Sequence, residues 1–295
     1  MLNKVIKNNA IKVLKNIFRL FSLDLKKVTK FDLPLYIKTY GEESVQRKKF
    51  YNISVGAYKG FGGGFQHPCW TNIDLNRTWK NDKYFPGFPE FNTSTDLAHD
   101  LLDMTDLPVD SSSAELVHSR FSVDRITDEA AQYFFNEVFR ILKKGGVFRI
   151  VSTNVDLDYR AYRNNDKKYF FWLDDNISIE QMFLFHVFTQ LSTVYSDPAS
   201  IKVSDDEFRN IINSMTYEDA LNHLASKCSL EIQENNRYDH FNWWNQQKYK
   251  QMLEKAGFTL VYRSYPEQSA ALVMRNQYYF DNDHAKVMMY MEAVK

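Results

Sequence analysis

Cysteine is scarce in this sequence, because Cys69 and Cys228 are the only two among 295 residues and lie far apart. A small secreted domain held by disulfides would carry more, so we expect a reducing, cytoplasmic location. Long apolar runs are also missing, and none approaches the roughly twenty residues of a membrane-spanning helix. The seven histidines show no paired spacing of the kind that binds a metal ion, so no metal site is expected.

An excess of one charge is absent as well. Lys+Arg and Asp+Glu both number 37, which argues against a nucleic-acid partner. The distribution is nevertheless uneven, since Asp24 is the one acidic residue in the strongly basic stretch 1–30. Within it, residues 3–21 alternate as a basic and apolar amphipathic helix. Either this arm makes peripheral contact with an anionic inner membrane face, or it packs on its own domain or on a second subunit.

The rest of the chain is organised around residues 100–152. A short apolar run at 114–117 predicts a buried strand, and Thr127 predicts the N-cap of a helix. Lysines at 143–144 suit the last helical turn, and glycines at 145–146 predict its end. The apolar run 147–151 then predicts a second strand. Strand, helix and strand in this order indicate a right-handed crossover in a parallel sheet, with ligands at the carboxyl ends of the strands.

Several segments carry a family resemblance: HPCWTNID, LPVDSSSAELVHS, NEVFRILKKGGVFRI, DLDYRAYRNNDKKYF and RYDHFNWWNQQKYKQMLEKAGF. Together they resemble class I S-adenosylmethionine-dependent methyltransferases of the type 11 family, in particular a subgroup common in bacterial surface-glycan gene clusters. The resemblance implies an α/β, doubly wound, mostly parallel sheet of seven strands whose last strand is antiparallel. It divides the chain into a helical arm and connector, 1–45, and a methyltransferase-like domain, 46–295, with a helical lid insertion at about 165–240.

The resemblance also implies a cofactor, S-adenosylmethionine, and positions that bind it. Gly56 and Ala57 occupy the glycine-rich turn after the first strand, where the backbone passes close to the methionine part. Asp74 ends the second strand, where a carboxylate accepts hydrogen bonds from the ribose hydroxyls; alternatively it caps the following helix. Either Asp100 or Asp103 is expected near the adenine amino group.

The end of the fourth strand, where the family lines the sulfonium, holds Ser119. Immediately beyond it this chain departs from the subgroup, which has a histidine at the position of Phe121 and Glu-His at the positions of Asp124 and Arg125. If that histidine serves as a base, this protein must use another residue or lack the activity.

A sugar hydroxyl needs a general base, and the candidate is His240 beside Asp239, at the junction between the lid and the last large helix. The alternative is a histidine hydrogen-bonded within the cluster of Trp243 and Trp244. His186, in a helical aromatic stretch, is expected to be a core histidine. The implied function is O-methylation of a sugar or surface-glycan intermediate, at the cytoplasmic membrane face. The alternatives are a non-catalytic partner protein with the same fold and another nucleotide-using enzyme.

Overall fold

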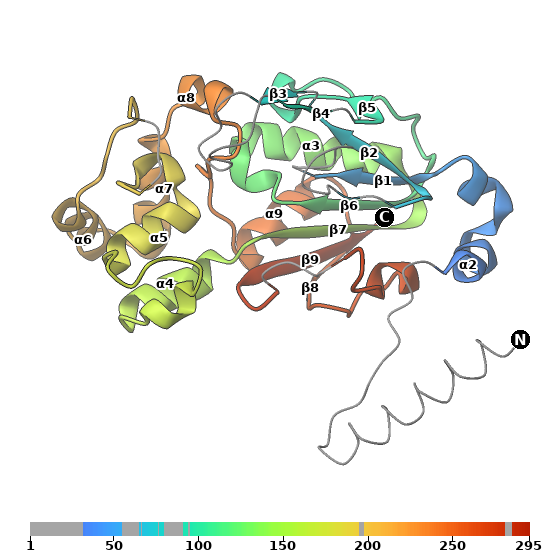
Figure 1. The fold of residues 1–295 in the computed structure, drawn as a ribbon. Coiled ribbons are helices and arrows are strands. Elements are labelled where there is room, and N and C mark those ends of the chain that lie inside the picture. Colours follow the sequence, from blue (N-terminus) through green and yellow to red (C-terminus); the bar gives the residue numbers. More distant parts are fainter. Residues whose placement is uncertain are drawn as a thin grey trace, which may run out of the picture.

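The computed structural model describes residues 32–54, 65, 67–75, 77–79, 91–93, 95–194, 198–280 and 285–295. Over these residues the chain forms an α/β fold around one seven-stranded sheet (Figure 1). Across the sheet the strands follow the order β5 (Leu97–Ala98), β2 (Trp70–Asp74), β1 (Phe50–Ile53), β6 (Ala114–Arg120), β7 (Leu142–Thr153), β9 (Met288–Val294) and β8 (Leu260–Ser264). A separate antiparallel pair joins β3 (Arg77–Trp79) and β4 (Phe91–Thr93).

Neighbouring strands from β5 to β7 pair in parallel, whereas β9 pairs antiparallel with both β7 and β8. A mostly parallel seven-stranded sheet with an antiparallel last strand is the predicted fold class, which is confirmed. Because the parallel strands point the same way, their carboxyl ends meet at a single edge of the sheet. In folds of this class, ligands bind at that edge.

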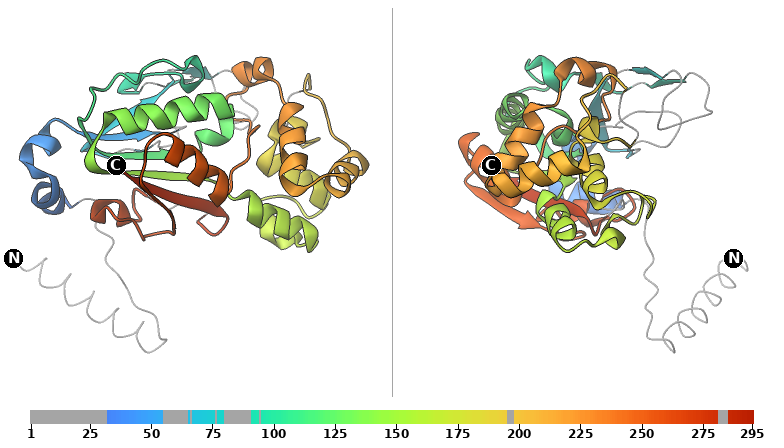
Figure 2. Two further views of the ribbon diagram at one scale, coloured as in Figure 1. Left: turned by 180° about the vertical axis from the view of Figure 1, so that it is seen from behind. Right: turned by 90° about the vertical axis from the view of Figure 1, so that its left-hand side faces the viewer.

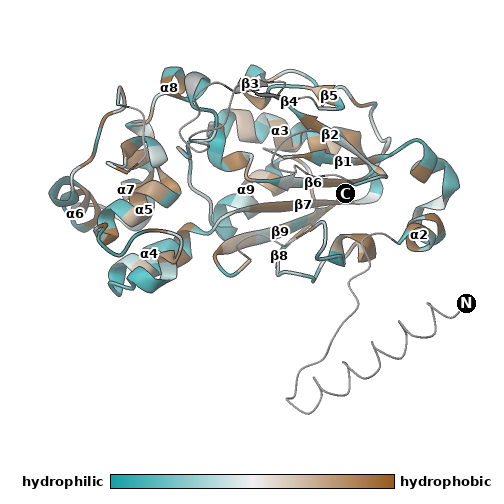
Figure 3. Ribbon diagram, in the orientation of Figure 1, coloured by the Kyte–Doolittle hydropathy of each residue, from teal (hydrophilic) through white to brown (hydrophobic). Residues whose placement is uncertain are grey.

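Helices α3 (Asp128–Ile141) and α9 (Gln246–Lys255) cover one face of the sheet (Figure 2). Their apolar stripes meet the strands in the larger hydrophobic core, where Phe134 and Phe135 pack against Phe148 of β7. The strands β6 and β7 are correspondingly coloured as mainly hydrophobic in Figure 3. The helical period and the apolar strands together therefore account for this layer of the fold.

Helix α3 begins as predicted, because Oγ1 of its N-cap Thr127 accepts a hydrogen bond from the N–H of Ala130. Its end differs. The helix stops at Ile141, and the next residue, Leu142, already pairs with β6. The lysines at 143–144, expected in the last helical turn, lie in β7 instead. Pairing across the sheet outweighs the local helix signal at this point.

The opposite face of the sheet is covered by α2 (Leu33–Gln46) and the segment around η5 (Leu272–Arg275). The HPCW segment fastens α2 to the sheet. Nε2 of His67 lies 3.1 Å from the Tyr36 hydroxyl, and Nε1 of Trp70 donates to that same hydroxyl at 2.8 Å. Tyr36 belongs to α2, so this motif has a clear packing role.

A row of polar side chains crosses this second face, with one residue from each of six adjacent strands. In spatial order they are Asn72, Asn52, His118, Arg149, Glu292 and Tyr262. Hydrogen bonds join the first three members: Nδ2 of Asn52 donates to Oδ1 of Asn72 at 3.1 Å, and Nδ1 of His118 lies 2.9 Å from Oδ1 of Asn52. All of the row except the partly buried Tyr262 is buried, so it forms a polar layer within an apolar surrounding.

Between β7 and β8 the chain forms a run of helices with a hydrophobic core of its own. The run comprises α4 (Val155–Arg163), η3 (Lys167–Phe170), α5 (Ile179–Val187), η4 (Thr189–Leu191), α6 (Asp205–Ser214), α7 (Tyr217–Ser226) and α8 (Leu230–Asn235). Figures 1 and 2 place these helices beyond the end of the sheet to which β7 runs. They therefore face the carboxyl ends of the parallel strands, in the part of the chain expected to form a lid.

Two expectations concern residues outside the described ranges, namely the amphipathic arm 1–30 and the glycine-rich turn at Gly56 and Ala57. Among the described residues, no helix is long and apolar enough to cross a bilayer. Within the same ranges, no three His, Cys, Asp or Glu side chains gather as they would around a metal ion.

Candidate functional site

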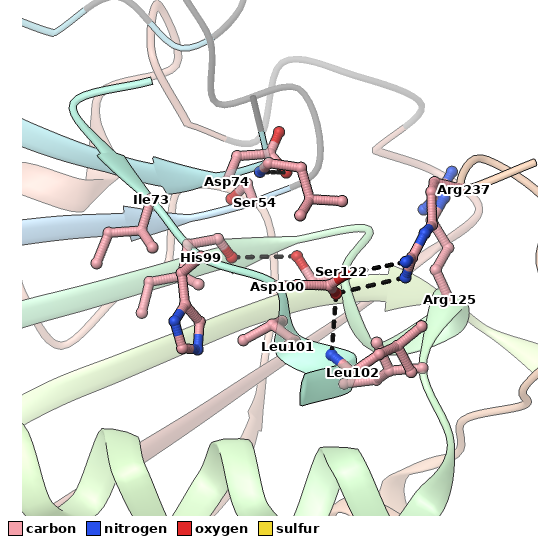
Figure 4. Close-up of a pocket in the computed structure, with 13 residues that line it drawn as sticks. Ser54, Ile73, Asp74, His99, Asp100, Leu101, Leu102, Ser122, Arg125 and Arg237 are labelled. Carbon is pink, nitrogen blue, oxygen red and sulfur yellow. Dashed lines mark hydrogen bonds and ion pairs between the residues drawn. The ribbon is translucent and has the colours of Figure 1, made fainter. Parts of the chain in front are cut away.

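A cavity opens at the carboxyl edge of the sheet (Figure 4). Its walls come from the ends of β1, β2 and β5, from the turn after β6 and from the chain that leads into α9. The lining residues are Ile53, Ser54, Ile73, Asp74, Leu75, His99, Asp100, Leu101, Leu102, Ser122, Arg125, Ile126 and Arg237. This composition combines apolar walls with a few charged groups, as small-molecule sites do.

Two carboxylates enter this cavity from neighbouring strands. Asp74 is the last residue of β2, and Oδ1 of its side chain accepts a hydrogen bond from the N–H of Leu75 at 2.8 Å. Asp100 follows β5 and caps η1 (Leu101–Asp103), with the N–H of Leu102 donating to Oδ1 at 3.0 Å. Both carboxylates are therefore oriented by the backbone just beyond their strands. They offer acceptor oxygens for a ligand that presents hydroxyl or amino groups.

Asp100 also binds a residue that lies far away in the sequence. Nη2 of Arg237 is 2.9 Å from Oδ2 of Asp100, and Nη1 is 3.4 Å from Oδ1. Arg237 follows α8, so this two-point ion pair joins the helical run to the sheet edge, as the dashed lines in Figure 4 show. Sequence reasoning missed Arg237, although it begins the RYDH segment that carried part of the family resemblance.

Two serines tie the ends of β1 and β6 together at the cavity. The N–H of Arg120 donates to Oγ of Ser54 at 2.8 Å, and that hydroxyl donates to Oδ1 of Asn52 at 2.7 Å. Oγ of Ser122 donates to the carbonyl oxygen of Ile53 at 3.1 Å. The backbone of the β1 end is thus fixed immediately before the glycine-rich segment of the sequence.

The six predicted cofactor positions separate into three groups. Asp74 and Asp100 line the cavity. Asp103 is exposed and Ser119 is buried beside Ile150 of β7, so neither belongs to the described lining. Gly56 and Ala57 lie outside the described residues. Of the two acids considered for the third strand, the structure thus brings Asp100 to Asp74 and leaves Asp103 outside.

The predicted base, His240, lies between α8 and α9 and is not among the residues that line the cavity. Its ring Nδ1 is 2.6 Å from the carbonyl oxygen of His186, and its backbone N–H donates to Oγ1 of Thr189 at 3.2 Å. A carbonyl can only accept, so Nδ1 carries the proton and the lone pair is on Nε2. Burial, assisted by the charge of Arg125, lowers the pKa of His240 well below its usual value. The imidazole is consequently neutral, while the adjacent Asp239 is fully buried.

A second histidine is oriented by a carboxylate. Nδ1 of His186 lies 2.9 Å from Oδ1 of Asp158, and the Asp158 side chain is completely buried. The ring of Trp172 packs 4.7 Å from the His186 ring, measured between centroids. The expectation of a core histidine thus describes its packing, but the carboxylate partner was not anticipated.

Phe121, Asp124 and Arg125, where the chain departs from the family pattern, take part in contacts that hold the strand ends together. Arg125 donates from Nη1 to the carbonyl oxygen of Phe121 and from Nε to that of Tyr238, the latter at 3.1 Å. Asp124 is fully buried and accepts hydrogen bonds from the N–H and Oγ1 of Thr153, at 3.2 and 2.5 Å. Burial raises the pKa of Asp124, which favours its protonated form. These residues join the end of β6 to the end of β7 and to the chain after α8.

No protein-family model and no curated protein matches the sequence. The fold is similar to that of solved structures described as methyltransferases, all at low identity. Human N-acetylserotonin methyltransferase in complex with S-adenosylmethionine is 11% identical over 89% of this chain and 53% of its own, with a TM-score of 0.36. An S-adenosylmethionine-dependent methyltransferase from Mesorhizobium loti is 10% identical over 83% of this chain and 90% of its own, with a TM-score of 0.36.

The structure described as PigF with S-adenosylhomocysteine is 12% identical over 68% of this chain, with a TM-score of 0.30. The match spans 34% of the PigF chain, so the matched part of this chain covers about a third of that longer one.

Proposed function

We propose that the protein is an S-adenosylmethionine-dependent methyltransferase that O-methylates a sugar or surface-glycan intermediate. The observation that carries the proposal is the convergence of Asp74 and Asp100 in one cavity at the carboxyl edge of the sheet. In a parallel α/β sheet this edge is where nucleotide-like ligands bind. The family resemblance supplies the chemistry and the acceptor class.

The cavity offers groups suited to the adenosine part of the cofactor. Asp74 presents a carboxylate, which can accept from both hydroxyls of a ribose. Asp100 presents a carboxylate for an amino group, and the apolar side chains of Ile73, Leu101 and Ile126 supply walls for a flat ring. The resemblance assigns Gly56 and Ala57, which follow β1 in the sequence, to the methionine part, and Ser119 to the lining of the sulfonium. When bound, S-adenosylmethionine supplies an activated methyl group on a sulfonium.

Transfer to a hydroxyl requires in-line alignment and a group that accepts the hydroxyl proton. His240 suits the second task, because its neutral ring holds the lone pair on Nε2 while Nδ1 is fixed by the carbonyl of His186. Asp239 lies beside it and is assigned a supporting role. Burial lowers the pKa of His240 well below its usual value, which weakens it as a base and counts against this role in the unliganded site.

The proposal also places the protein on the cytoplasmic side of a membrane on which glycan intermediates are assembled. Residues 1–30 would supply the contact, through their basic and apolar faces. The acceptor would then be presented at the membrane face to the helices beyond the sheet edge.

Isothermal titration calorimetry with S-adenosylmethionine and S-adenosylhomocysteine tests the cofactor directly. We expect one site, which Asp74→Ala weakens. A panel of nucleotide sugars and lipid-linked saccharides, followed by detection of S-adenosylhomocysteine, then tests the acceptor. If neither S-adenosylmethionine nor S-adenosylhomocysteine binds, the proposal that the protein is a methyltransferase is refuted. Binding without turnover on any acceptor, in the presence of the intact arm, would favour the alternative of a non-catalytic partner, to which the departure at Phe121 also points.

A further inference from the structure

The chain between α8 and α9 passes along the carboxyl edge of the sheet. We call residues 236–242 the strap. The carbonyl oxygen of Tyr238 accepts from Nε of Arg125 at 3.1 Å, and the N–H of Phe241 donates to the carbonyl oxygen of Asp124 at 3.0 Å. Both contacts fix the strap to the turn after β6. The strap therefore continues the helical run directly onto the wall of the cavity.

Arg237 gives the strap a further attachment, on the other side of the cavity. Its guanidinium forms the two-point ion pair with Asp100, which follows β5. The side chains of Arg237 and Asp100 are 21% and 16% exposed, so water screens the pair only in part. Both residues line the cavity. The strap is consequently held at the ends of two different strands, with the cavity between its attachments (Figure 4).

We propose that Arg237 is a positioning residue that couples cofactor binding to closure of the strap. It holds the Asp100 carboxylate for the adenosine part of the ligand, and the bound ligand in turn holds the strap against the sheet. This inference rests on the proposed function, because it assigns S-adenosylmethionine to this cavity. It adds a residue from the far end of the chain to that site.

The physical reason is preorganisation. Asp100 is oriented by two sources, the N–H of Leu102 and the guanidinium of Arg237, so it need not reorient when a ligand arrives. A carboxylate has about four lone-pair positions, which leaves acceptor capacity for a ligand amino group beside these contacts. Charge-assisted two-point pairs also resist rotation better than a single hydrogen bond does.

The coupling has a consequence for the reacting end of the site. His240 lies on the strap, three residues after Arg237, so the contact that completes the adenosine wall also sets where the candidate base stands. Linkage requires the effect to be mutual: a ligand that favours the closed strap is bound more tightly when the strap can close. Cofactor binding and closure of the acceptor side would therefore favour each other.

The test compares calorimetric titrations of S-adenosylhomocysteine into the full chain and three variants. Arg237→Ala should weaken binding about tenfold, as expected for loss of a charge-assisted contact in a partly exposed pair. Arg237→Lys should recover part of this loss, because one ionic contact remains possible. Arg209→Ala, which removes an arginine paired with Glu180 and Asp206 elsewhere in the helical run, should leave affinity unchanged.

Hydrogen exchange separates positioning from simple stabilisation. In the wild type, S-adenosylhomocysteine should slow exchange of the strap amides; in Arg237→Ala, at saturating ligand, the strap should remain unprotected while the amides of β1 and β6 stay as slow as before. If the wild type binds and Arg237→Ala binds equally well with equal strap protection, the inference is overturned and the proposed function stands. If the wild type itself does not bind, the proposed function fails first.

Discussion

Nη1 of Arg149 lies 2.7 Å from Oε1 of Glu292, and neither side chain has any exposed surface. Arg149 also donates to Oγ of Ser264 at 3.0 Å and to the carbonyl oxygen of Tyr265 at 2.9 Å, while Glu292 accepts from the Tyr262 hydroxyl at 2.6 Å. Two opposite charges are thus enclosed between β7 and β9 with their hydrogen-bonding groups engaged. Such a pair is tolerated only while both partners are present.

Arg149→Met should therefore lower the free energy of unfolding by about 3–5 kcal/mol, because it leaves the Glu292 carboxylate buried without its cation. Urea denaturation followed by circular dichroism measures this change. The double variant Arg149→Met with Glu292→Leu should recover much of the loss, since it removes both charges. Arg47→Ala, which breaks a highly exposed pair with Glu43, serves as the control and should leave the midpoint unchanged. A small effect of Arg149→Met alone would contradict this account.

Asp74→Ala should weaken binding of S-adenosylhomocysteine by about 1.5–3 kcal/mol, the range for hydrogen bonds to a charged acceptor. Asp103→Ala is the matched control, because Asp103 is also a predicted cofactor residue but is exposed and outside the cavity lining. Calorimetry on both folded variants decides the point. Equal affinity of the Asp74 variant and the wild type would remove Asp74 from the site.

Stability should fall as the pH is lowered through about 6.5. Burial lowers the pKa of His67 to about 3 and lowers the pKa values of His118 and His240 well below their usual value. Below about pH 6.5, these histidines are therefore protonated in the unfolded state but stay neutral in the folded state. Each extra proton bound by the unfolded state lowers the free energy of unfolding by about 1.4 kcal/mol per pH unit.

Urea denaturation between pH 7.5 and 5 measures this slope. His118→Gln should reduce it by about one proton, and His67→Gln should do the same if the first variant does not fold. A slope that neither substitution changes would show that other groups control the acid sensitivity.

His240→Ala should lower turnover on an accepted substrate by roughly a hundredfold, as expected for a general base, and leave cofactor affinity nearly unchanged. Single-turnover kinetics with radiolabelled S-adenosylmethionine give the rate. His186→Ala is the informative comparison, because its ring is oriented by Asp158 as a competing base would be. Normal turnover in the His240 variant, with a large loss in the His186 variant, would transfer the role to His186.

Residues 1–30 should bind vesicles that contain anionic lipid and be dispensable for folding. Co-sedimentation of the full chain with vesicles of increasing phosphatidylglycerol content measures the first property, and thermal unfolding of a chain that begins after residue 30 measures the second. Binding that ignores the lipid charge, or a truncated chain without a cooperative transition, would favour packing against the domain or a second subunit.

The fold was accessible from the sequence because its signals are local. The apolar run that became β6, the cap at Thr127 and the periodic stripe of α3 each depend on neighbouring residues. The predicted end of α3 was wrong because the true end depends on a contact between residues far apart in the sequence. Leu142 leaves the helix to pair with Ala114, and a contact across 28 residues leaves no mark in the local pattern.

Some residues of the candidate site could likewise be predicted from local signals, and others could not. Asp74 and Asp100 were found because each follows a recognisable strand, and strand ends of a parallel sheet must meet. The ion pair of Asp100 with Arg237 spans 137 positions, and the partner of His186 lies on a different helix. Neither spacing follows from a helical or strand period, so both required the tertiary structure.

The polar row that begins at Asn72 and ends at Tyr262 has a consequence for how the strands find one another. Successive side chains of a strand alternate between faces, so a slip of one residue would move Arg149 from beside Glu292 into the apolar layer beneath α3 and α9. An apolar strand could tolerate such a slip far more easily. The row therefore makes misregistered strand pairing less stable than the native register during folding. The native register also keeps the strand ends, with their carboxylates, level with one another.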